Sequence, residues 1–203
     1  MGAIGRYIAL EGSEGCGKST QAARLATDLD AVLTREQGGT RIGGLIRGIL
    51  LDPAHRELSH RSEALLNAAD RAQLMAEVVA PAVEAGRHVV SDRSVYSTLA
   101  YQGYGRGLPL DELRAINDWA IDGRWPDLAV LIEVEATTLD ERMSTRVKDR
   151  FELEPTEFHH RVRQGFAEMA TADPQRWAVV DGNADPDTVF ARLRATVRER
   201  LGV

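Results

Sequence analysis

Residues 12–20 have the residue types and spacing of a phosphate-binding loop, G-x-x-x-x-G-K-[ST]. Glycines in such a loop let the backbone wrap closely around a polyphosphate, so that backbone N–H groups and the start of the next helix point at negative charge. Lys18 would then reach the β- and γ-phosphates, and Ser19 would hold Mg²⁺. The predicted phosphate-binding residues are Gly12, Ser13, Glu14, Gly15, Cys16, Gly17, Lys18, Ser19 and Thr20.

A second polar set follows the apolar run at residues 88–90. Asp92 suits Mg²⁺ coordination, and Arg93 suits a phosphate clamp, because a guanidinium group pairs with phosphate oxygens through parallel hydrogen bonds. Beyond them, polar side chains recur at helical spacing: Ser94, Ser97, Thr98, Tyr101 and Gln102. This stripe predicts one wall of a ligand pocket. A solvated helix face and a structural Asp92–Arg93 salt bridge are the alternatives.

Two other segments offer arginines for an anionic ligand. Arg35 stands just before a Gly-Gly pair, with Arg41 and Arg47 downstream, and loop arginines beside glycines are good candidates for ligand contacts. In a helix expected over residues 62–79, Asn67 and Arg71 stand four residues apart on a polar side. The apolar side of that helix is expected to consist of Leu65, Ala68, Ala69, Ala72 and Met75.

The charge-rich segment around residues 142–157 predicts a mobile lid. Arg142, Arg146 and Arg150 recur every four residues, which would align three positive charges along one helical edge. A lid of this kind can bring arginine to a transferring phosphoryl group, whose charge is spread over three oxygens. The alternative is a solvated helix whose arginines are neutralised by nearby acidic residues.

Five short apolar runs must position these groups, and helix-rich stretches separate them. The runs cover residues 7–10, 31–33, 88–90, 128–134 and 177–180. Strands that alternate with helices predict an α/β fold with a parallel sheet covered on both faces. Several runs end in polar residues, which fits a ligand site at the carboxyl ends of the strands. Residues 103–109 are expected to form one loop.

Bulk composition narrows the class of protein. A length of 203 residues suits one domain over residues 1–203. The net charge of -6 gives no overall basic field, so we expect no nucleic-acid partner. The single cysteine, Cys16, rules out an internal disulfide and fits a reducing compartment. No stretch approaches a membrane span, so we expect a cytoplasmic protein without a membrane partner.

Taken together, these motifs resemble the thymidylate kinase family over nearly the whole chain. The resemblance rests on residues 12–20, 34–40 and 68–73, the Asp92-Arg93 pair, residues 97–103 and residues 149–152. It implies a P-loop NTPase fold with a five-stranded parallel sheet flanked by helices, and a homodimer. It also implies that the γ-phosphoryl of ATP is transferred to dTMP, giving dTDP and ADP for nucleotide biosynthesis, with Mg²⁺ held by Ser19 and Asp92.

The resemblance also implies individual roles. Gly15 stands where some members carry their catalytic arginine, so this chain resembles the bacterial type whose arginine lies in the lid. The implied catalytic residues are Lys18, Arg93, Arg146 and Arg150, with either lid arginine as the donor. The implied dTMP-binding residues are Glu14, Arg35, Arg47, Asn67, Arg71, Arg93, Ser97, Thr98, Tyr101 and Gln102.

Three positions depart from the pattern of the family. Asn67 stands where an aromatic residue commonly stacks on the thymine ring, Gln37 replaces a usual proline, and Ser94 replaces a frequent aromatic residue or histidine. The alternatives are therefore a kinase for dUMP or dCMP on the same scaffold or, from another class, a P-loop ATPase or regulatory switch. A catalytically dead scaffold protein is disfavoured because Lys18 and Arg93 are both present.

Overall fold

The computed structural model describes residues 4–143 and 149–203, without the side chains of residues 140–143. The strands are β1 (Tyr7–Glu11), β2 (Val32–Arg35), β3 (Val89–Asp92), β4 (Leu128–Glu133) and β5 (Trp177–Asp181). The α-helices are α1 (Lys18–Asp28), α2 (Arg41–Leu51), α3 (His60–Leu74), α4 (Ala80–Glu84), α5 (Val95–Thr98), α6 (Leu110–Ala120), α7 (Ala136–Met143), α8 (Thr156–Ala172) and α9 (Pro186–Leu201). Two π-helical segments, η1 (Met75–Val79) and η2 (Leu99–Gly105), continue α3 and α5.

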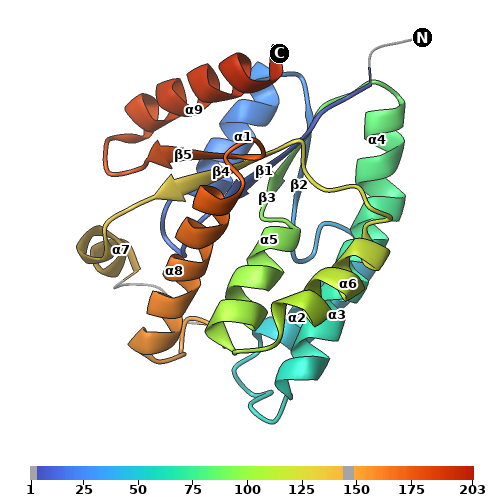
Figure 1. Ribbon diagram of the computed structural model, residues 1–203, viewed down its shortest axis with the longest axis vertical. Helices are drawn as coiled ribbons and strands as arrows, with labels where there is room; N and C mark the ends of the chain where they lie inside the picture. The colour runs from blue at the N-terminus through green and yellow to red at the C-terminus, as the bar shows by residue number, and fades with distance from the viewer. Residues whose placement is uncertain (1–3, 144–148) are drawn as a thin grey trace.

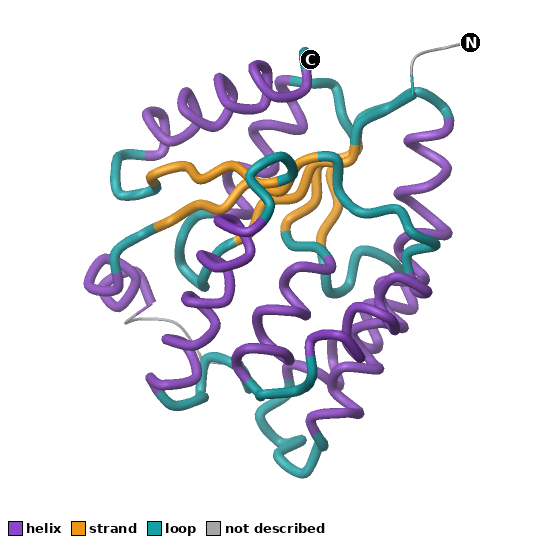
Figure 2. The backbone as a smooth tube through the Cα atoms, viewed as in Figure 1, coloured by secondary structure: helices purple, strands orange, loops and turns teal. Residues whose placement is uncertain are grey.

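The five strands form one parallel sheet in the order β2-β3-β1-β4-β5. Figure 2 shows this sheet as a central layer with helices on both sides. β1 lies in the middle, and its end is aligned with the end of β3, since Leu10 pairs with Asp92. Arg35 at the end of β2 also pairs with Asp92. The predicted sheet is confirmed, and its register brings the polar strand ends to one edge.

Alternating side chains on the buried strands build two separate cores. Ile8, Leu10 and Val130 pack with residues of α1 and α9 on one face. Tyr7 and Leu131 pack on the other face with residues of α5, η2 and α8. In the view of Figure 1, α1 and α9 lie above the sheet, and α5 and α8 lie below it. Burial on both faces explains why these strands are almost wholly apolar in sequence.

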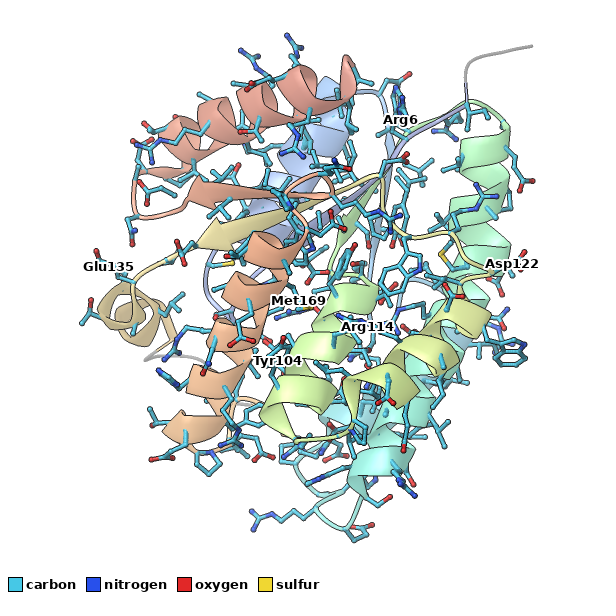
Figure 3. The ribbon with its side chains drawn as sticks, viewed as in Figure 1. Arg6, Tyr104, Arg114, Asp122, Glu135 and Met169 are labelled. Carbon is cyan, nitrogen blue, oxygen red and sulfur yellow. The ribbon has the colours of Figure 1, made fainter. Side chains whose placement is uncertain are left out.

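Close packing of α8 on η2 fixes the helix that was predicted to line the pocket. A Cβ added at Gly165 would lie 2.9 Å from the Tyr104 Cβ, and one at Gly105 would lie 2.5 Å from the Phe158 ring. Tyr104 is visible at this contact in Figure 3. The helix runs to Gly105, so the loop expected over residues 103–109 starts later than predicted.

The predicted sides of α3 are partly reversed. Asn67 and Arg71 are buried, whereas Leu65 is 54% exposed and Ala69 is also exposed. Ala68 and Met75 are buried as expected. The polar residues point inward because neighbouring elements supply hydrogen bonds that compensate for their burial.

Candidate active site

The loop between β1 and α1 has the backbone of a phosphate cradle. Gly12 has a φ of 140°, and a Cβ there would lie 2.7 Å from the Ile132 carbonyl oxygen, so only glycine fits. Gly17 precedes α1 with a φ of 94° and open space around it. No side chain of the described residues caps the start of α1. Its first N–H groups are therefore available to an anion, which the helix dipole also favours.

Lys18 and Ser19, the residues predicted to bind phosphate and metal, are the first two residues of α1. Lys18 is almost fully buried, and its Nζ atom donates to the Ser13 carbonyl at 2.7 Å and contacts Cys16 Sγ at 3.6 Å. Ser19 Oγ donates to Asp92 Oδ2 at 2.5 Å. This hydroxyl and carboxylate bring two hard oxygen donors together at the mouth of the loop, and that donor set suits Mg²⁺ with phosphate and water as its other ligands.

Arg93 lies between the phosphate loop and the polar helix stripe. Its Nη2 atom contacts Glu14 Oε1 at 2.6 Å and the Tyr101 hydroxyl at 3.1 Å, and Nη1 donates to Ser97 Oγ at 3.0 Å. Its backbone has a φ of 75°, which non-glycine residues rarely adopt and which is found mainly at functional sites. Burial raises the pKa of Glu14, but Arg93 and Lys18 outweigh this and hold it at about 2.

A cavity of about 790 Å³ opens at this edge of the sheet and joins the phosphate loop to the other predicted residues. The predicted residues that line it are Glu14, Gly15, Gly17, Lys18, Ser19, Thr20, Arg35, Arg47, Asn67, Arg71, Asp92, Arg93, Ser97, Thr98, Tyr101 and Gln102. Ser94 does not line it, because the Ser94 hydroxyl donates to buried Glu11 at 2.7 Å. Gly12, Ser13 and Cys16 also stay outside its lining and shape the loop from behind.

Two arginines lie close together at one end of the cavity. Arg35 and Arg47 both line it, and Arg35 is exposed. Burial lowers the pKa of Arg47, and the neighbouring Arg35 lowers it further. Two guanidinium groups that repel one another in this way are suited to an anion with at least two charges.

Arg71 at the opposite end is held by a dense network. Its Nη2 atom lies 2.6 Å from Glu36 Oε2 and 3.0 Å from Thr98 Oγ1, and Nη1 donates to Asn117 Oδ1. Burial raises the pKa of the Glu36 carboxyl to about 7, although Arg71 opposes the rise. The Glu36 Oε1 atom is buried without a hydrogen-bond partner among the described residues. This network fixes the guanidinium against the cavity wall.

The loop after β2 is tied down despite the absence of proline at position 37. Gln37 Nε2 donates to Asn67 Oδ1, and Asn67 Nδ2 donates to the Glu63 carbonyl at 2.8 Å. Gly38 N donates to Asp70 Oδ1 at 3.0 Å, and Arg47 donates to the Gln37 carbonyl at 3.1 Å. Two of the three departures from the family pattern therefore contact each other.

The structure corrects the predicted arginine edge of the lid. Arg150 lies in a turn, so it does not continue the helical edge that begins with Arg142 in α7. The turn forms because the Asp149 carboxylate accepts hydrogen bonds from Phe151 N and Glu152 N, both at 2.9 Å. Arg150 is buried and contacts Glu63 Oε2 at 2.7 Å, outside the lining of the cavity. Arg146 lies outside the described residues.

Sequence reasoning missed several buried partners of the site. Glu11 accepts hydrogen bonds from Ser94 and from Ser97, the latter at 2.6 Å, and burial raises its pKa. Glu63 and Asn117 are likewise completely buried and hydrogen-bonded. Glu11 is the last residue of β1 and directly follows its apolar run, which is a usable signal. Glu63 and Asn117 lie on helices whose sequence pattern does not reveal partners 39 to 46 residues away.

Comparison with known proteins gives a consistent result. The family model described as thymidylate kinase matches residues 10–193. A thymidylate kinase of Deinococcus radiodurans is 45% identical, covering 97% of this chain and 98% of its own length. A thymidylate kinase of Oleidesulfovibrio alaskensis is 43% identical, covering 95% and 97%.

A solved structure agrees with the sequence matches. The crystal structure of thymidylate kinase from Ehrlichia chaffeensis aligns with a TM-score of 0.79 at 30% identity, over 97% of this chain and 100% of that one. Its P-loop NTPase fold matches the parallel sheet described above. The family model, the full-length relatives and the fold agree, and this chain belongs to the thymidylate kinase family.

Proposed function

We propose that this enzyme transfers the γ-phosphoryl group of ATP to dTMP, giving dTDP and ADP. The observation that carries the proposal is the continuity of one cavity, which runs from Lys18 in the phosphate loop to Arg71 and Gln102 at its far end. ATP phosphates occupy the loop, and the nucleoside monophosphate lies across the cavity with its phosphate near Arg35, Arg47 and Arg93. Residues 1–203 act as a single kinase domain with its lid near residues 142–157.

Phosphoryl transfer in this site depends on the alignment of the two phosphates more than on proton transfer. The second pKa of a phosphate monoester is about 6, so the acceptor is largely dianionic at neutral pH and requires no general base. Two mutually repelling anions must instead be aligned, and charge on the transferring group must be compensated. Glu14, Ser97 and Tyr101 hold Arg93 between the phosphate loop and the acceptor end of the cavity, the part that would take up the nucleoside monophosphate. Arg93 therefore clamps the γ-phosphate of ATP and the phosphate of the acceptor.

Ser19 and Asp92 would hold Mg²⁺, which would neutralise part of the charge on the terminal phosphates of ATP. Lys18 exchanges its contact with the Ser13 carbonyl for a phosphate oxygen. For the transition-state arginine we favour Arg146, since Arg150 would have to leave a buried carboxylate before it reached the cavity. Arg146 lies outside the described residues, so its assignment rests on the sequence alone.

Transfer to dUMP is the second candidate activity. It is favoured by the amide pair Gln37–Asn67, which gives the cavity a polar wall at the position where the family commonly has an aromatic residue. The deciding experiment incubates the purified protein with Mg²⁺ and ATP and follows ADP release with dTMP, dUMP, dCMP, dGMP or dAMP. We expect dTMP to be the best acceptor. ADP release that is independent of any acceptor would favour an ATPase or switch.

We also propose a homodimer formed through α2, α3 and α6. These neighbouring helices expose large apolar side chains: Leu45 and Ile49 on α2, Leu65 on α3 and Trp119 on α6. Gly44 and Gly48 stand on the exposed face of α2 beside Leu45, with open space around them. Exposed apolar surface rimmed by polar residues commonly marks an association site, and small residues allow helices to approach closely.

No helix among the described residues is long and apolar enough to span a membrane. A cytoplasmic location remains a proposal that rests on the composition of the chain.

A further inference from the structure

Glu63 lies beneath the acceptor end of the cavity, where it joins three elements. Its side chain is completely buried, and it comes from the first turn of α3. Oε1 accepts a hydrogen bond from Gln102 Nε2 at 2.8 Å, and Oε2 contacts Arg106 at 3.1 Å and Arg150 at 2.7 Å. One carboxylate therefore connects the pocket helix η2 with the turn that contains Arg150.

The contact with Gln102 determines which way the amide of that residue faces. A carboxylate paired with two guanidinium groups accepts hydrogen bonds and has none to donate. The half of the Gln102 amide that faces Glu63 must then be the NH₂ group, and the carbonyl oxygen lies on the other side of the amide carbon. Gln102 lines the cavity, and within the described part of the chain its Oε1 atom has no hydrogen-bond donor.

An acceptor oxygen at this point discriminates between pyrimidines. Thymine and uracil carry an N–H group at N3, which satisfies the Gln102 Oε1 atom. Cytosine has a bare ring nitrogen at N3, which would face that oxygen with a second lone pair. A buried acceptor that is left without a donor costs free energy. A site that is built to accept a hydrogen bond from the base therefore rejects bases that lack the N–H group.

We propose that Glu63 is a positioning residue that sets the base selectivity of this enzyme by fixing the orientation of the Gln102 amide. The inference rests on the proposed function, because it assumes that the acceptor base lies at this end of the cavity. It restricts acceptors to pyrimidine-2,4-diones, so dTMP and dUMP are accepted and dCMP is rejected. Glu63 itself does not line the cavity and acts only through Gln102.

The test compares Glu63→Gln with Glu154→Gln. Both variants remove a carboxylate partner of Arg106, since Glu154 Oε1 lies 2.6 Å from Arg106 Nη1, but only Glu63 touches Gln102. A glutamine at position 63 can donate to Gln102 Oε1 and thereby let the amide turn over. We expect the ratio of kcat/KM for dTMP to that for dCMP to fall about 10-fold or more in Glu63→Gln, mainly through KM. The ratio should be unchanged in Glu154→Gln.

A second variant covers the case in which Glu63→Gln does not fold. Gln102→Met keeps the volume of the side chain, leaves Glu63 with its two arginines and removes the amide. It should lower the dTMP to dCMP ratio by a similar factor, and adding Glu63→Gln should lower it no further, because both changes act through one amide.

The possible outcomes separate the two proposals. An unchanged ratio in Glu63→Gln or in Gln102→Met overturns the positioning role, and so does an equal fall in Glu154→Gln, which would reflect the lid rather than the amide. A wild-type enzyme that phosphorylates none of the monophosphates defeats the proposed function itself. A wild-type enzyme that phosphorylates dTMP and dCMP equally well defeats only the inference about Glu63.

Discussion

The side-chain amides of Gln37 and Asn67 bind each other on the wall of the acceptor end of the cavity, with Gln37 Nε2 donating to Asn67 Oδ1. Asn67 Nδ2 donates one of its hydrogens to the Glu63 carbonyl. The pair therefore presents a polar surface in which the two amides hold each other in place. It joins the loop after β2 to α3, so that the residue types at positions 37 and 67 are linked in space although 30 residues separate them.

Replacing Asn67 with phenylalanine should tighten dTMP binding. An aromatic face in contact with a base contributes about 1–3 kcal/mol, so we expect the dissociation constant for dTMP to fall about fivefold or more. The measurement is a titration of dTMP by calorimetry, with ATP binding as an internal reference. Gln37→Ala is the matched control, because it breaks the amide pair without adding an aromatic face. Equal tightening in both variants would show that stacking is not the cause.

Lys18→Ala and Arg93→Ala should each lower turnover by about 10³-fold or more, because each removes a positive charge that faces the reacting phosphates in the proposed function. Circular dichroism and thermal unfolding would establish that the fold survives. Arg41→Ala is the control, since Arg41 is exposed at the start of α2 and does not line the cavity. Wild-type turnover in either test variant would refute the assignment of that residue.

The Glu14–Arg93 ion pair should make stability depend on pH in the acid range. The pKa of Glu14 is held at about 2 in the folded protein, below the ordinary value of 4.5. Between these values the unfolded chain binds more protons, so the free energy of unfolding rises with pH and this contribution is complete above about 4.5. Its size is on the order of 1–3 kcal/mol, because the Glu14 side chain remains partly exposed.

Urea unfolding at pH 3 and at pH 6 checks this dependence. Glu14→Gln should reduce the difference between the two midpoints, since a glutamine does not titrate. Tyr101→Phe removes the hydrogen bond from the tyrosine, the smallest contribution to the lowered pKa of Glu14, but keeps the ion pair with Arg93, so it should retain most of the slope of the wild type. If Glu14→Gln keeps the full slope, other carboxylates are responsible for it.

The sheet and the phosphate loop were predictable because their signals are local. Gly12, Lys18 and Ser19 stand in one short motif, and each strand is a continuous apolar run because both of its faces are buried. The helical stripe after Arg93 was also local, and Ser97, Thr98, Tyr101 and Gln102 do line the cavity.

The predictions that were wrong concern residues whose positions depend on partners far away in the sequence. Spacing placed Arg150 on a helical edge, whereas the Asp149 carboxylate starts a turn and Glu63, 87 residues earlier, accepts the guanidinium group. The apolar residues of α3 predicted that Leu65 is buried. Instead, the polar side of α3 faces the cavity, because Arg71 donates hydrogen bonds to Glu36 and Thr98 there, and Leu65 is exposed. A pattern of residue types along one helix contains no information about such partners.

The proposed dimer gives the last prediction. A glutamate in place of Leu45, which is 64% exposed on α2, would place an unpaired charge in the buried interface, and such a charge costs several kcal/mol. We expect Leu45→Glu to weaken association by about 10²-fold or more, giving monomers at micromolar concentration in light scattering. Val179→Glu is the control, because Val179 is an exposed apolar residue on β5, outside α2, α3 and α6. If the Leu45→Glu variant stays dimeric, the interface does not include Leu45, and if the wild type is a monomer, the proposed dimer is wrong.

Because Arg47 lies on α2 with Leu45 and lines the cavity, loss of the dimer should also raise the KM for dTMP.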